Sequence, residues 1–360
     1  MFQYNQRINS IPQNIWSLIN QIDELKGQWI GGVKLNPQAL GRLKRWTLIT
    51  SSGSSTRIEG SKMSDEEVEA FIRGLKTQKF SDRDKQEVKG YYELLENIFN
   101  SWQHISFTER TIKHFHKELL KYSEKDKGHL GEYKKGENKV EMFNASGKSL
   151  GVIFDTTPAY LTPKQMQELV DWAKEALALK SAHPLLIIGN FLVEFLAIHP
   201  FQDGNGRLSR ILTNLLMLKT GYAYAPYVSQ EKLVEDNKAE YYVALRRSQK
   251  NLSARGGSAY GGKDEQTDIS DWLEFFLGIC LAQGKMAIDL LSKENIEKLL
   301  SPKQLLVWQY LEKASEATPL EITKMAKVAR PTVSQALEVL LRLKKIERIG
   351  QGRATRYRKI

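Results

Sequence analysis

The sequence contains one cysteine, Cys280, among its 360 residues. A single thiol excludes an internal disulfide, and with it the small disulfide-stabilised folds of secreted proteins. Long hydrophobic runs are lacking too: the longest, residues 184–198, is interrupted by Asn190 and Glu194 and is too short to span a bilayer. The N-terminal segment also lacks the basic-then-apolar pattern of a secretion signal. These absences predict a cytoplasmic protein with no membrane segment.

The composition is that of an ordinary globular protein with one strongly basic end. Hydrophobic residues make up 41% and charged residues 26% of the chain, whose length suffices for two or three domains. Residues 301–360 carry 13 Lys and Arg against five Glu, whereas the first 300 residues are close to neutral. This excess predicts a nucleic acid or another acidic partner for the C-terminal segment.

Residues 199–207 form a polar, glycine-containing stretch between two apolar segments, 185–198 and 208–218, that are long enough to be buried helices. Pro200 disfavours helical geometry at His199, so we expect the first helix to end there. The second helix then starts near Gly206, with its free N–H groups facing back into the loop. Free amides and a favourable helix dipole predict an anion-binding site.

The charged side chains of this stretch fit a nucleotide. Arg207 and Arg210 share one face of the first helical turn, where cations oppose the dipole, and a polyphosphate ligand would explain both. Asp203 could hold Mg²⁺ together with phosphate oxygens, and His199 could act as a general base near neutral pH. A histidine at a helix end, or a glycine-rich loop with one aspartate, is by itself more often structural. The combination within twelve positions has no such explanation.

The stretch closely resembles the signature of the Fic family, HPFx(D/E)GNGRxxR, and matches every fixed position. Fic proteins typically transfer AMP from ATP to a hydroxyl group of a target protein. The resemblance, which covers most of residues 50–250, implies a mostly α fold: a Fic-type helical bundle with a small β-hairpin flap. It also implies His199 as the catalytic base and Asp203 as the Mg²⁺ ligand. The nucleotide-binding residues it implies at the loop are Gly204, Asn205, Gly206, Arg207 and Arg210.

A serine-rich segment, residues 51–60, contains a second motif. By composition it is a loop or a weak helix end, and on spacing alone Glu59 is a solvated carboxylate at a surface helix terminus, with Gly60 as the C-cap. Ser55 and Glu59 would share one face of a helical turn. The segment also matches the inhibitory motif (S/T)xxxE(G/N) of Fic proteins, whose glutamate pairs with the second arginine of the signature. The resemblance therefore implies that Ser55, Glu59 and Gly60 inhibit the site through Arg210.

Two further segments are assigned by the same resemblance. Residues 139–143 and 150–154 are short β-like runs around a turn at 144–147, which fits either a surface excursion or the Fic flap (139–154), whose edge docks the target segment as an added strand. Asn237 and Tyr242 resemble residues that line the adenosine pocket, although aromatic residues at helical spacing are more often core.

The rest of the first 300 residues predicts helices and one loop. The expected helices are 11–25, 37–50, 64–75, 81–102, 108–122, 162–179, 181–198, 208–218 and 268–291. Ser64 and Glu67 have the form of a capping box, and Thr162 that of an N-cap followed by proline. His114 and His116 point to different faces of one helix, so we expect ordinary polar residues rather than a metal pair. Residues 252–267 are rich in glycine and serine and predict a loop.

Residues 301–360 predict three helices (302–313, 319–327 and 330–345) and two strands around a basic turn at 350–353, which is the pattern of a winged helix-turn-helix. Its third helix would present Thr332, Ser334 and Gln335 to DNA bases. The phosphate contacts would come from Arg348, Arg353, Arg356 and Arg358. A winged helix that contacts protein is the alternative.

The predicted organisation is an N-terminal helical region (1–100), a Fic core (101–250), a loop and connecting helices (251–300) and a winged helix (301–360). The implied reaction is attack of a Ser, Thr or Tyr hydroxyl on the α-phosphorus of ATP. The sequence is also compatible with a homodimer. One alternative is removal of AMP from a modified protein, with Glu59 orienting a water. Another is a DNA-binding regulator whose core only senses nucleotide, which the intact His199 disfavours because sensing needs no base.

Overall fold

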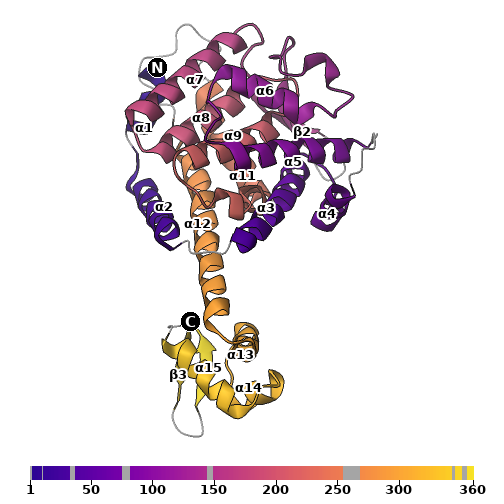
Figure 1. Ribbon diagram of the computed structural model, residues 1–360. Coiled ribbons are helices and arrows are strands. Elements are labelled where there is room, and N and C mark those ends of the chain that lie inside the picture. Colours follow the sequence, from indigo (N-terminus) through magenta and orange to yellow (C-terminus); the bar gives the residue numbers. More distant parts are fainter. Residues whose placement is uncertain are drawn as a thin grey trace. The chain divides into compact units, whose positions relative to one another are not determined.

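The computed structural model describes residues 2–9, 11–32, 37–74, 82–143, 149–253, 268–342, 345–350 and 355–360. It divides into two units, Met1–Ile288 and Asp289–Ile360, which are described separately. Most of the described residues are helical (Figure 1). None of the described helices combines the length and apolar character needed to cross a membrane.

The described helices of the first unit are α1 (Phe2–Asn9), α2 (Gln13–Gly32), α3 (Pro37–Ile58), α4 (Asp65–Arg73), α5 (Arg83–Ser101), α6 (Glu109–Leu120), α7 (Thr162–Leu179), α8 (Pro184–Ile198), α9 (Asn205–Lys219), α10 (Gln230–Asp236) and α11 (Lys238–Ser253). Helix α12 (Ser270–Leu299) begins in this unit and ends in the second. Two short 3₁₀ turns, η1 (Lys127–His129) and η2 (Ala225–Tyr227), complete the described helical elements.

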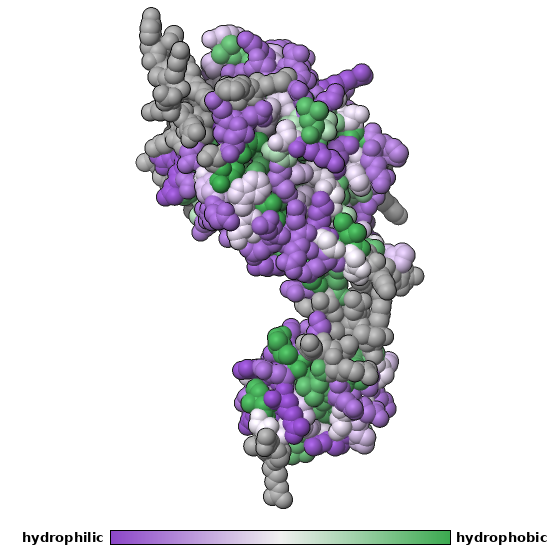
Figure 2. All heavy atoms as spheres, turned by 90° about the vertical axis from the view of Figure 1, so that its left-hand side faces the viewer, coloured by the Kyte–Doolittle hydropathy of each residue, from purple (hydrophilic) through white to green (hydrophobic). Residues whose placement is uncertain are grey.

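Helices α8 and α9 form the centre of the first unit (Figure 1). Nearly every side chain of both helices is buried, as expected for helices that are surrounded by others. Helix α8 packs against α7, α9, α11 and α1, and α9 packs against α5, α6 and α3. Cys280 of α12 is fully buried in this unit. On the face shown in Figure 2, hydrophobic residues appear as small patches separated by hydrophilic ones.

Helix α3 corrects the expectation of a helix that ends at Thr50 followed by a loop or weak helix end, because it continues to Ile58. Serines compete with helical backbone bonds, which is why the composition predicted a loop. Here the small side chains at 51–56 are buried against α5, α9 and α10, so tertiary packing overrides propensity. Two hydroxyls bond backward within the helix: Ser52 Oγ donates to Leu48 O and Thr56 Oγ1 to Ser52 O.

The two caps predicted in this unit have different outcomes. The Ser64–Glu67 capping box is confirmed at the start of α4, whereas Thr162 is not an N-cap. Helix α7 begins at Thr162 itself, Leu161 precedes it without a side-chain cap, and the Thr162 hydroxyl donates to Pro158 O at 3.1 Å. Helices α1, α10 and α11 were not predicted, and α2 and α12 extend beyond their expected ends.

The predicted hairpin is present. Strands β1 (Lys139–Phe143) and β2 (Ser149–Asp155) pair antiparallel, with Lys139 opposite Asp155 and Phe143 opposite Ser149. The expected turn lies outside the described residues, as does most of the predicted loop at 252–267.

The second unit contains α13 (Pro302–Lys313), α14 (Pro319–Met325), α15 (Arg330–Arg342), β3 (Ile346–Ile349) and β4 (Arg356–Lys359). The strands pair antiparallel, and Ala317 bridges to Tyr357 of β4. Residues such as Val307, Leu311 and Leu340 form an apolar core of this unit's own. Its three helices and two strands follow the predicted order, while α15 ends at Arg342 and residues 351–354 lie outside the described part of the chain.

Candidate active site

The loop between α8 and α9 turns sharply at two residues with positive φ. His199 is the C-cap of α8 in the left-handed conformation (φ 50°), and its N–H donates to Phe195 O at 3.0 Å. Gly204 is the N-cap of α9 with φ 81°, a conformation that costs glycine little. The α8 end predicted from Pro200 is therefore confirmed, and α9 begins one residue before the expected Gly206.

Asn205 closes this loop on itself. Its Oδ1 accepts from Phe201 N at 2.9 Å and its Nδ2 donates to Phe201 O at 2.7 Å. The side chain is almost completely buried. Asn205 thus shapes the loop through the Phe201 backbone. Its contact with the nucleotide stays a prediction.

His116 of α6 packs against the loop between α8 and α9, a role that its sequence pattern did not predict. Its ring stacks on Phe201, with centroids 4.0 Å apart and planes inclined by 8°. Nδ1 accepts from Gly131 N at 2.9 Å, so Nε2 carries the proton and donates to Asp203 O at 3.1 Å. Burial lowers the pKa of His116 to about 4. His116 lies four residues after Ile112 and so shares the apolar face of α6, which is the signal that could have predicted its burial.

Lys134 is a second residue that sequence reasoning missed. Its buried ammonium donates to Asn138 Oδ1 and Thr156 Oγ1, both at 2.8 Å, and to Ile198 O at 3.1 Å. Its backbone N–H donates to Pro200 O. Because Asn138 precedes β1 and Thr156 follows β2, one side chain joins both ends of the hairpin to the end of α8. Burial lowers the pKa of Lys134 to about 8.

The two arginines at the start of α9 have different partners. Arg207 is fully buried between two carboxylates, with Nη1 2.9 Å from Glu87 Oε2 and Nη2 2.9 Å from Asp203 Oδ1. Arg210 donates from Nε to Ser55 Oγ and from Nη2 to Ser55 O, at 2.8 and 2.9 Å. Only Arg210 meets the predicted inhibitory segment.

Glu59 lies over the first turn of α9. Its Oε1 accepts from Arg210 Nη2 at 2.7 Å, which is the pairing implied by the resemblance. A Cβ at Gly206 would lie only 2.3 Å from the same oxygen, so the close approach requires glycine there. Burial would raise the pKa of Glu59, but attraction to Arg210 and its hydrogen bond outweigh burial and lower it. The helix N-terminus predicted to bind an anion therefore faces a carboxylate of the chain itself.

One carboxylate oxygen of Asp203 accepts hydrogen bonds, and the other accepts none from the described residues. Oδ1 accepts from Gly204 N and Arg207 Nη2, while Oδ2 lies 4.0 Å from Arg83 Nη2. Burial opposes ionisation, but the charge of Arg207 lowers the pKa of Asp203. The described residues contain no group of three or more His, Cys, Asp or Glu that could hold a metal ion by themselves. One available carboxylate oxygen beside an anion site fits Mg²⁺ that takes its other ligands from substrate and water.

His199 is neutral at physiological pH. Its Nδ1 donates to Leu196 O at 3.3 Å, which leaves Nε2 as an acceptor. Burial lowers its pKa to about 4. The imidazole can therefore accept a proton from a hydroxyl group.

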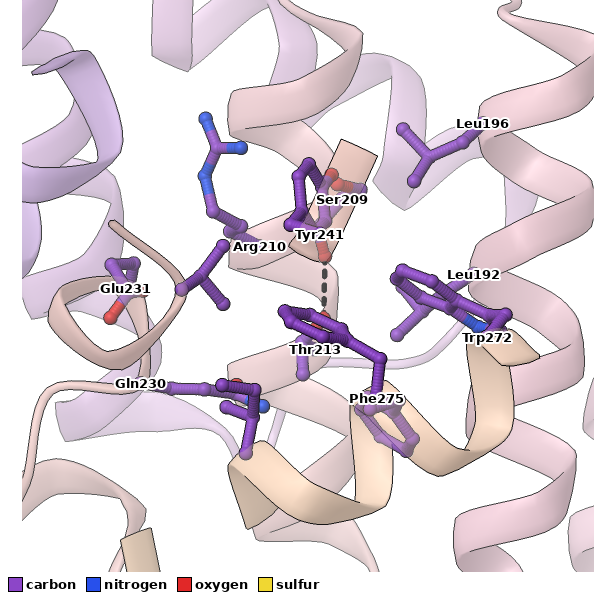
Figure 3. Close-up of a pocket in the computed structure, with 13 residues that line it drawn as sticks. Leu192, Leu196, Ser209, Arg210, Thr213, Gln230, Glu231, Tyr241, Trp272 and Phe275 are labelled. Atoms are coloured by element: carbon purple, nitrogen blue, oxygen red, sulfur yellow. Dashed lines mark hydrogen bonds between the residues drawn. The ribbon is translucent and has the colours of Figure 1, made fainter. Parts of the chain in front are cut away.

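Beside Arg210 lies a small cavity of about 30 Å³ (Figure 3). Tyr241, Trp272 and Phe275 form its aromatic wall, and Ser209, Arg210 and Glu231 line its polar side. This volume holds about one water molecule, not a nucleobase.

The predicted adenosine residues do not line this cavity. Asn237 is exposed and donates from Nδ2 to Leu233 O within α10. Tyr242 is half-buried, with its ring 5.1 Å from that of Tyr241. Burial and the charge of Glu59 raise the pKa of its phenol. Their contact with adenosine stays a prediction.

Comparisons with known proteins agree with the fold. Residues 106–217, which include the whole loop, match the model of the Fic/DOC family. A probable protein adenylyltransferase of Aquifex aeolicus is 27% identical over 127 residues, covering 35% of this chain and 36% of the relative. Protein adenylyltransferase fic-1 of Caenorhabditis elegans is 31% identical over 96 residues, covering 27% and 17%. The chain thus spans about a third or less of the length of these relatives.

Solved structures share the fold over more of the chain. A Fic family protein from Desulfovibrio desulfuricans G20 superposes with a TM-score of 0.61 at 23% identity, covering 98% of this chain and 97% of that one. A fragment of Fic-1 from C. elegans gives a TM-score of 0.58 at 20% identity, covering 78% and 73%. At these identities the likeness concerns the fold.

Proposed function

We propose that the protein is an adenylyltransferase that moves AMP from ATP to a hydroxyl group of a target protein. The observation that carries the proposal is the anion site at the start of α9. It combines helix N–H groups with Arg210, whose buried Nη1 has no hydrogen-bond partner among the described residues. The neutral His199 stands at the other end of the same short loop. The names of the relatives support this reaction.

In the proposed reaction, the acceptor oxygen bonds to the α-phosphorus while the bond to the β-phosphate oxygen breaks and pyrophosphate leaves. His199 takes the hydroxyl proton. The amides of residues 204–206 and Arg210 stabilise the charge that develops on the phosphate oxygens. Arg207 holds Asp203 in place, and Mg²⁺ bound there would neutralise phosphate charge.

The hairpin supplies a docking edge for the target. Backbone pairing with an added strand tolerates many sequences, so it suits an enzyme that must recognise an extended segment of protein. Lys134 fixes both ends of the hairpin to the residue before His199. A segment docked on this edge would be held in a constant position relative to the base.

Glu59 would inhibit the enzyme in this state. It occupies the position beside Gly206 and Arg210 that a phosphate of ATP needs, and Ser55 helps to orient the same arginine. Gly60, with φ 105°, turns the chain away directly after the carboxylate. Replacement of Glu59 by glycine should raise AMP transfer.

Removal of AMP is a second candidate activity. It is favoured by the position of Glu59, whose ionised carboxylate lies in the site beside Arg210 and could orient a water for attack. Glu59→Gly should then abolish removal while it raises transfer, so this variant separates the two activities.

The second unit is proposed to bind DNA. Ser334 and Gln335 are exposed near the start of α15, and Thr332 is half-buried. Two of the expected phosphate-binding arginines have acidic partners, since Arg356 pairs with Glu316 and Arg358 with Glu347. The support therefore comes from the overall excess of basic residues and from the predicted reading face.

Labelled ATP tests the main proposal. His199→Ala should abolish transfer of AMP to protein and leave ATP binding and thermal stability nearly unchanged. His114→Ala is the matched control, because that histidine is exposed on α6. Transfer at the wild-type rate in the His199 variant would disprove its assignment as the base.

A further inference from the structure

Helix α3 is anchored differently along its length. Its C-terminal third is part of the core: residues 51, 52 and 54–56 are almost completely inaccessible. Ser51 Oγ donates to Glu231 Oε2 at 2.6 Å, and the same buried carboxylate accepts from Tyr91 and Asn214. After Ile58 the chain reaches the surface at Glu59 and Gly60. Glu59 therefore follows the buried part of the helix, with 31% of its side chain exposed and its carboxylate on Arg210.

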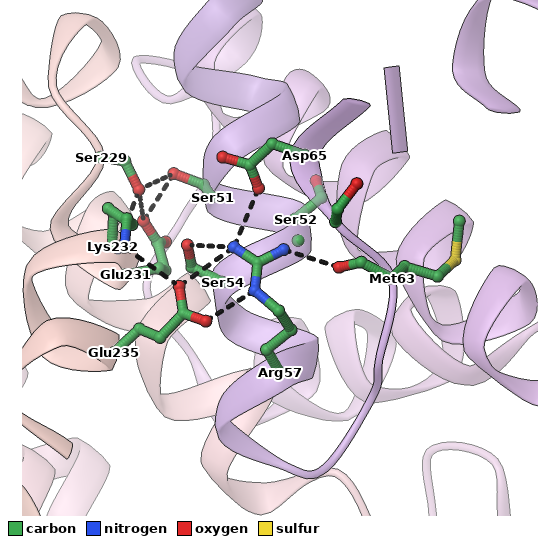
Figure 4. Close-up of polar contacts among 12 residues, drawn as sticks. Ser51, Ser52, Ser54, Arg57, Met63, Asp65, Ser229, Glu231, Lys232 and Glu235 are labelled. Atoms are coloured by element: carbon green, nitrogen blue, oxygen red, sulfur yellow. Dashed lines mark hydrogen bonds and ion pairs between the residues drawn. The ribbon is translucent and has the colours of Figure 1, made fainter. Parts of the chain in front are cut away.

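Arg57 holds this end (Figure 4). Its guanidinium donates two hydrogen bonds to Glu235 of α10, from Nε to Oε1 at 2.6 Å and from Nη2 to Oε2 at 3.0 Å. Nη2 also donates to Asp65 Oδ1 at the first residue of α4, at 2.8 Å. Nη1 donates to Met63 O at 2.8 Å. One side chain thus ties the last turn of α3 to α10, to α4 and to the connection between α3 and α4.

We propose that Arg57 is a positioning residue that latches the last turn of α3, and so holds Glu59 on Arg210. In this view, inhibition is relieved when the Arg57 latch opens and the turn that carries Glu59 unwinds, while the body of α3 stays in place. The inference rests on the proposed inhibition by Glu59.

The geometry links the two residues directly. Glu59 follows Arg57 by two positions, with the buried Ile58 between them, so contacts of Arg57 set the rotation of the turn that aims Glu59. The absence of a side chain at Gly53 leaves room for the guanidinium. A Cβ at Gly53 would lie 2.6 Å from Arg57 Nη1 and 2.8 Å from Asp65 Oδ1.

Departure of the whole helix would be the more costly route. It would expose the serine-rich core face and leave Glu231 with fewer hydrogen-bond donors in a buried position. It would also break the contacts of Arg210 with Ser55, which orient that arginine for a phosphate. Opening the latch breaks the contacts of Arg57, the pair of Glu59 with Arg210 and the backbone hydrogen bonds of the last turn, but it leaves the buried serines and Glu231 in place. The Arg57 side chain lies at the edge of the core, with about a fifth of it exposed.

Rates of AMP transfer from labelled ATP test the latch in the full chain. Arg57→Ala and Glu235→Gln should each raise the initial rate on the order of 10-fold, which is the size expected for losing hydrogen bonds to a charged partner. Arg57→Ala added to Glu59→Gly should have no further effect, because the carboxylate that the latch positions is already gone. Arg73→Ala is the control: it removes a surface ion pair with Glu69 on α4 and should leave the rate unchanged.

The outcomes separate this inference from the proposed function. If Glu59→Gly raises the rate but Arg57→Ala and Glu235→Gln do not, the latch is wrong and the inhibition by Glu59 stands. If Arg57→Ala raises the rate further in the Glu59→Gly background, Arg57 does not act through Glu59, and this result also overturns the latch.

If no variant transfers AMP, the proposed function fails, and hydrogen exchange still decides on the latch. Amides of residues 56–60 should exchange faster in Arg57→Ala than in the wild type, while those of residues 48–54 should not change. Equal exchange across 56–60 would overturn the inference whatever the activity.

Discussion

The imidazole of His116 lies flat against the ring of Phe201 and, through Nε2, donates to the carbonyl of Asp203. A residue of α6 thus holds two positions of the α8–α9 loop, one by stacking and one by a hydrogen bond. Asn205 braces the same loop from within. The shape of the loop therefore depends on side chains that never meet the nucleotide in the proposed reaction.

His116→Phe should keep the stacking but lose both hydrogen bonds of the ring. Asp203 O and Gly131 N would then lose a partner in a buried place, which costs about 1–3 kcal/mol each at most. We expect a lower free energy of unfolding in urea and a slower AMP transfer. His114→Phe, at the exposed histidine two residues earlier, should change neither, and equal stability of the two variants would contradict the role given to His116.

The same variant should weaken the response of stability to acid. Folded His116 has a pKa of about 4, whereas a histidine in the unfolded chain titrates near 6.5. Between these values the unfolded state binds more protons, so wild-type stability should fall as the pH decreases from about 6.5 to 4. His116→Phe removes this contribution. Unfolding curves at pH 7 and pH 4.5 for both proteins measure the difference, and an identical pH response would refute the buried neutral state of His116.

The rate of AMP transfer should depend little on pH near neutrality. Because burial lowers the pKa of His199 to about 4, the base stays unprotonated from pH 8 down to about 5, and the rate should fall only below that. The Glu59→Gly variant suits the measurement because it should be active. A profile with a midpoint near 6.5 would show that His199 is solvated as in a free peptide.

Lys134→Met should uncouple the hairpin from the loop. The apolar side chain fills similar space but cannot donate to Asn138, Thr156 or Ile198. We expect ATP binding to persist while transfer to a protein substrate falls by about 10-fold or more, because the docking edge loses its fixed position. Lys135→Met is the control, since that side chain is largely exposed. A parallel loss of ATP binding and transfer would instead indicate a general disruption of the site.

Removal of residues 301–360 should abolish binding to duplex DNA and spare AMP transfer by the Glu59→Gly variant. For the full chain, affinity should decrease steeply as salt increases, because contacts with phosphate release counterions. Gln335→Ala should reduce the preference among DNA sequences more than the affinity for DNA in general. Unchanged DNA binding after the truncation would mean that the basic segment has another partner.

Local rules predicted much of this structure. Pro200 and the glycines placed the loop correctly, and the capping box at Ser64 marked the start of α4. In each case the determining contacts lie within a few residues, so the sequence alone contains them. The pair of Glu59 and Arg210 was reached through a family motif, since nothing local joins residues 151 positions apart.

The remaining features depend on distant contacts. The helix at 51–58 forms because its serines are buried, which no propensity reveals. His116, Lys134 and Arg57 look like ordinary polar residues of helices or loops, and each gains its role from partners that the fold supplies. The contacts of Arg207 with Glu87 and Asp203, and of Asn205 with the Phe201 backbone, could not be predicted either. The motif predicts contacts with the nucleotide and not the hydrogen bonds within the protein that shape the loop.

The lone thiol of the chain has a practical consequence for studying motion at α3. Cys280 is fully inaccessible and burial raises its pKa, so it should resist alkylating reagents while the protein is folded. A cysteine introduced at the exposed Lys62, three residues after Glu59, would then be the one reactive thiol, with no native residue to remove first. A fluorescent or spin label at that point could follow the turn in solution while nucleotide is added.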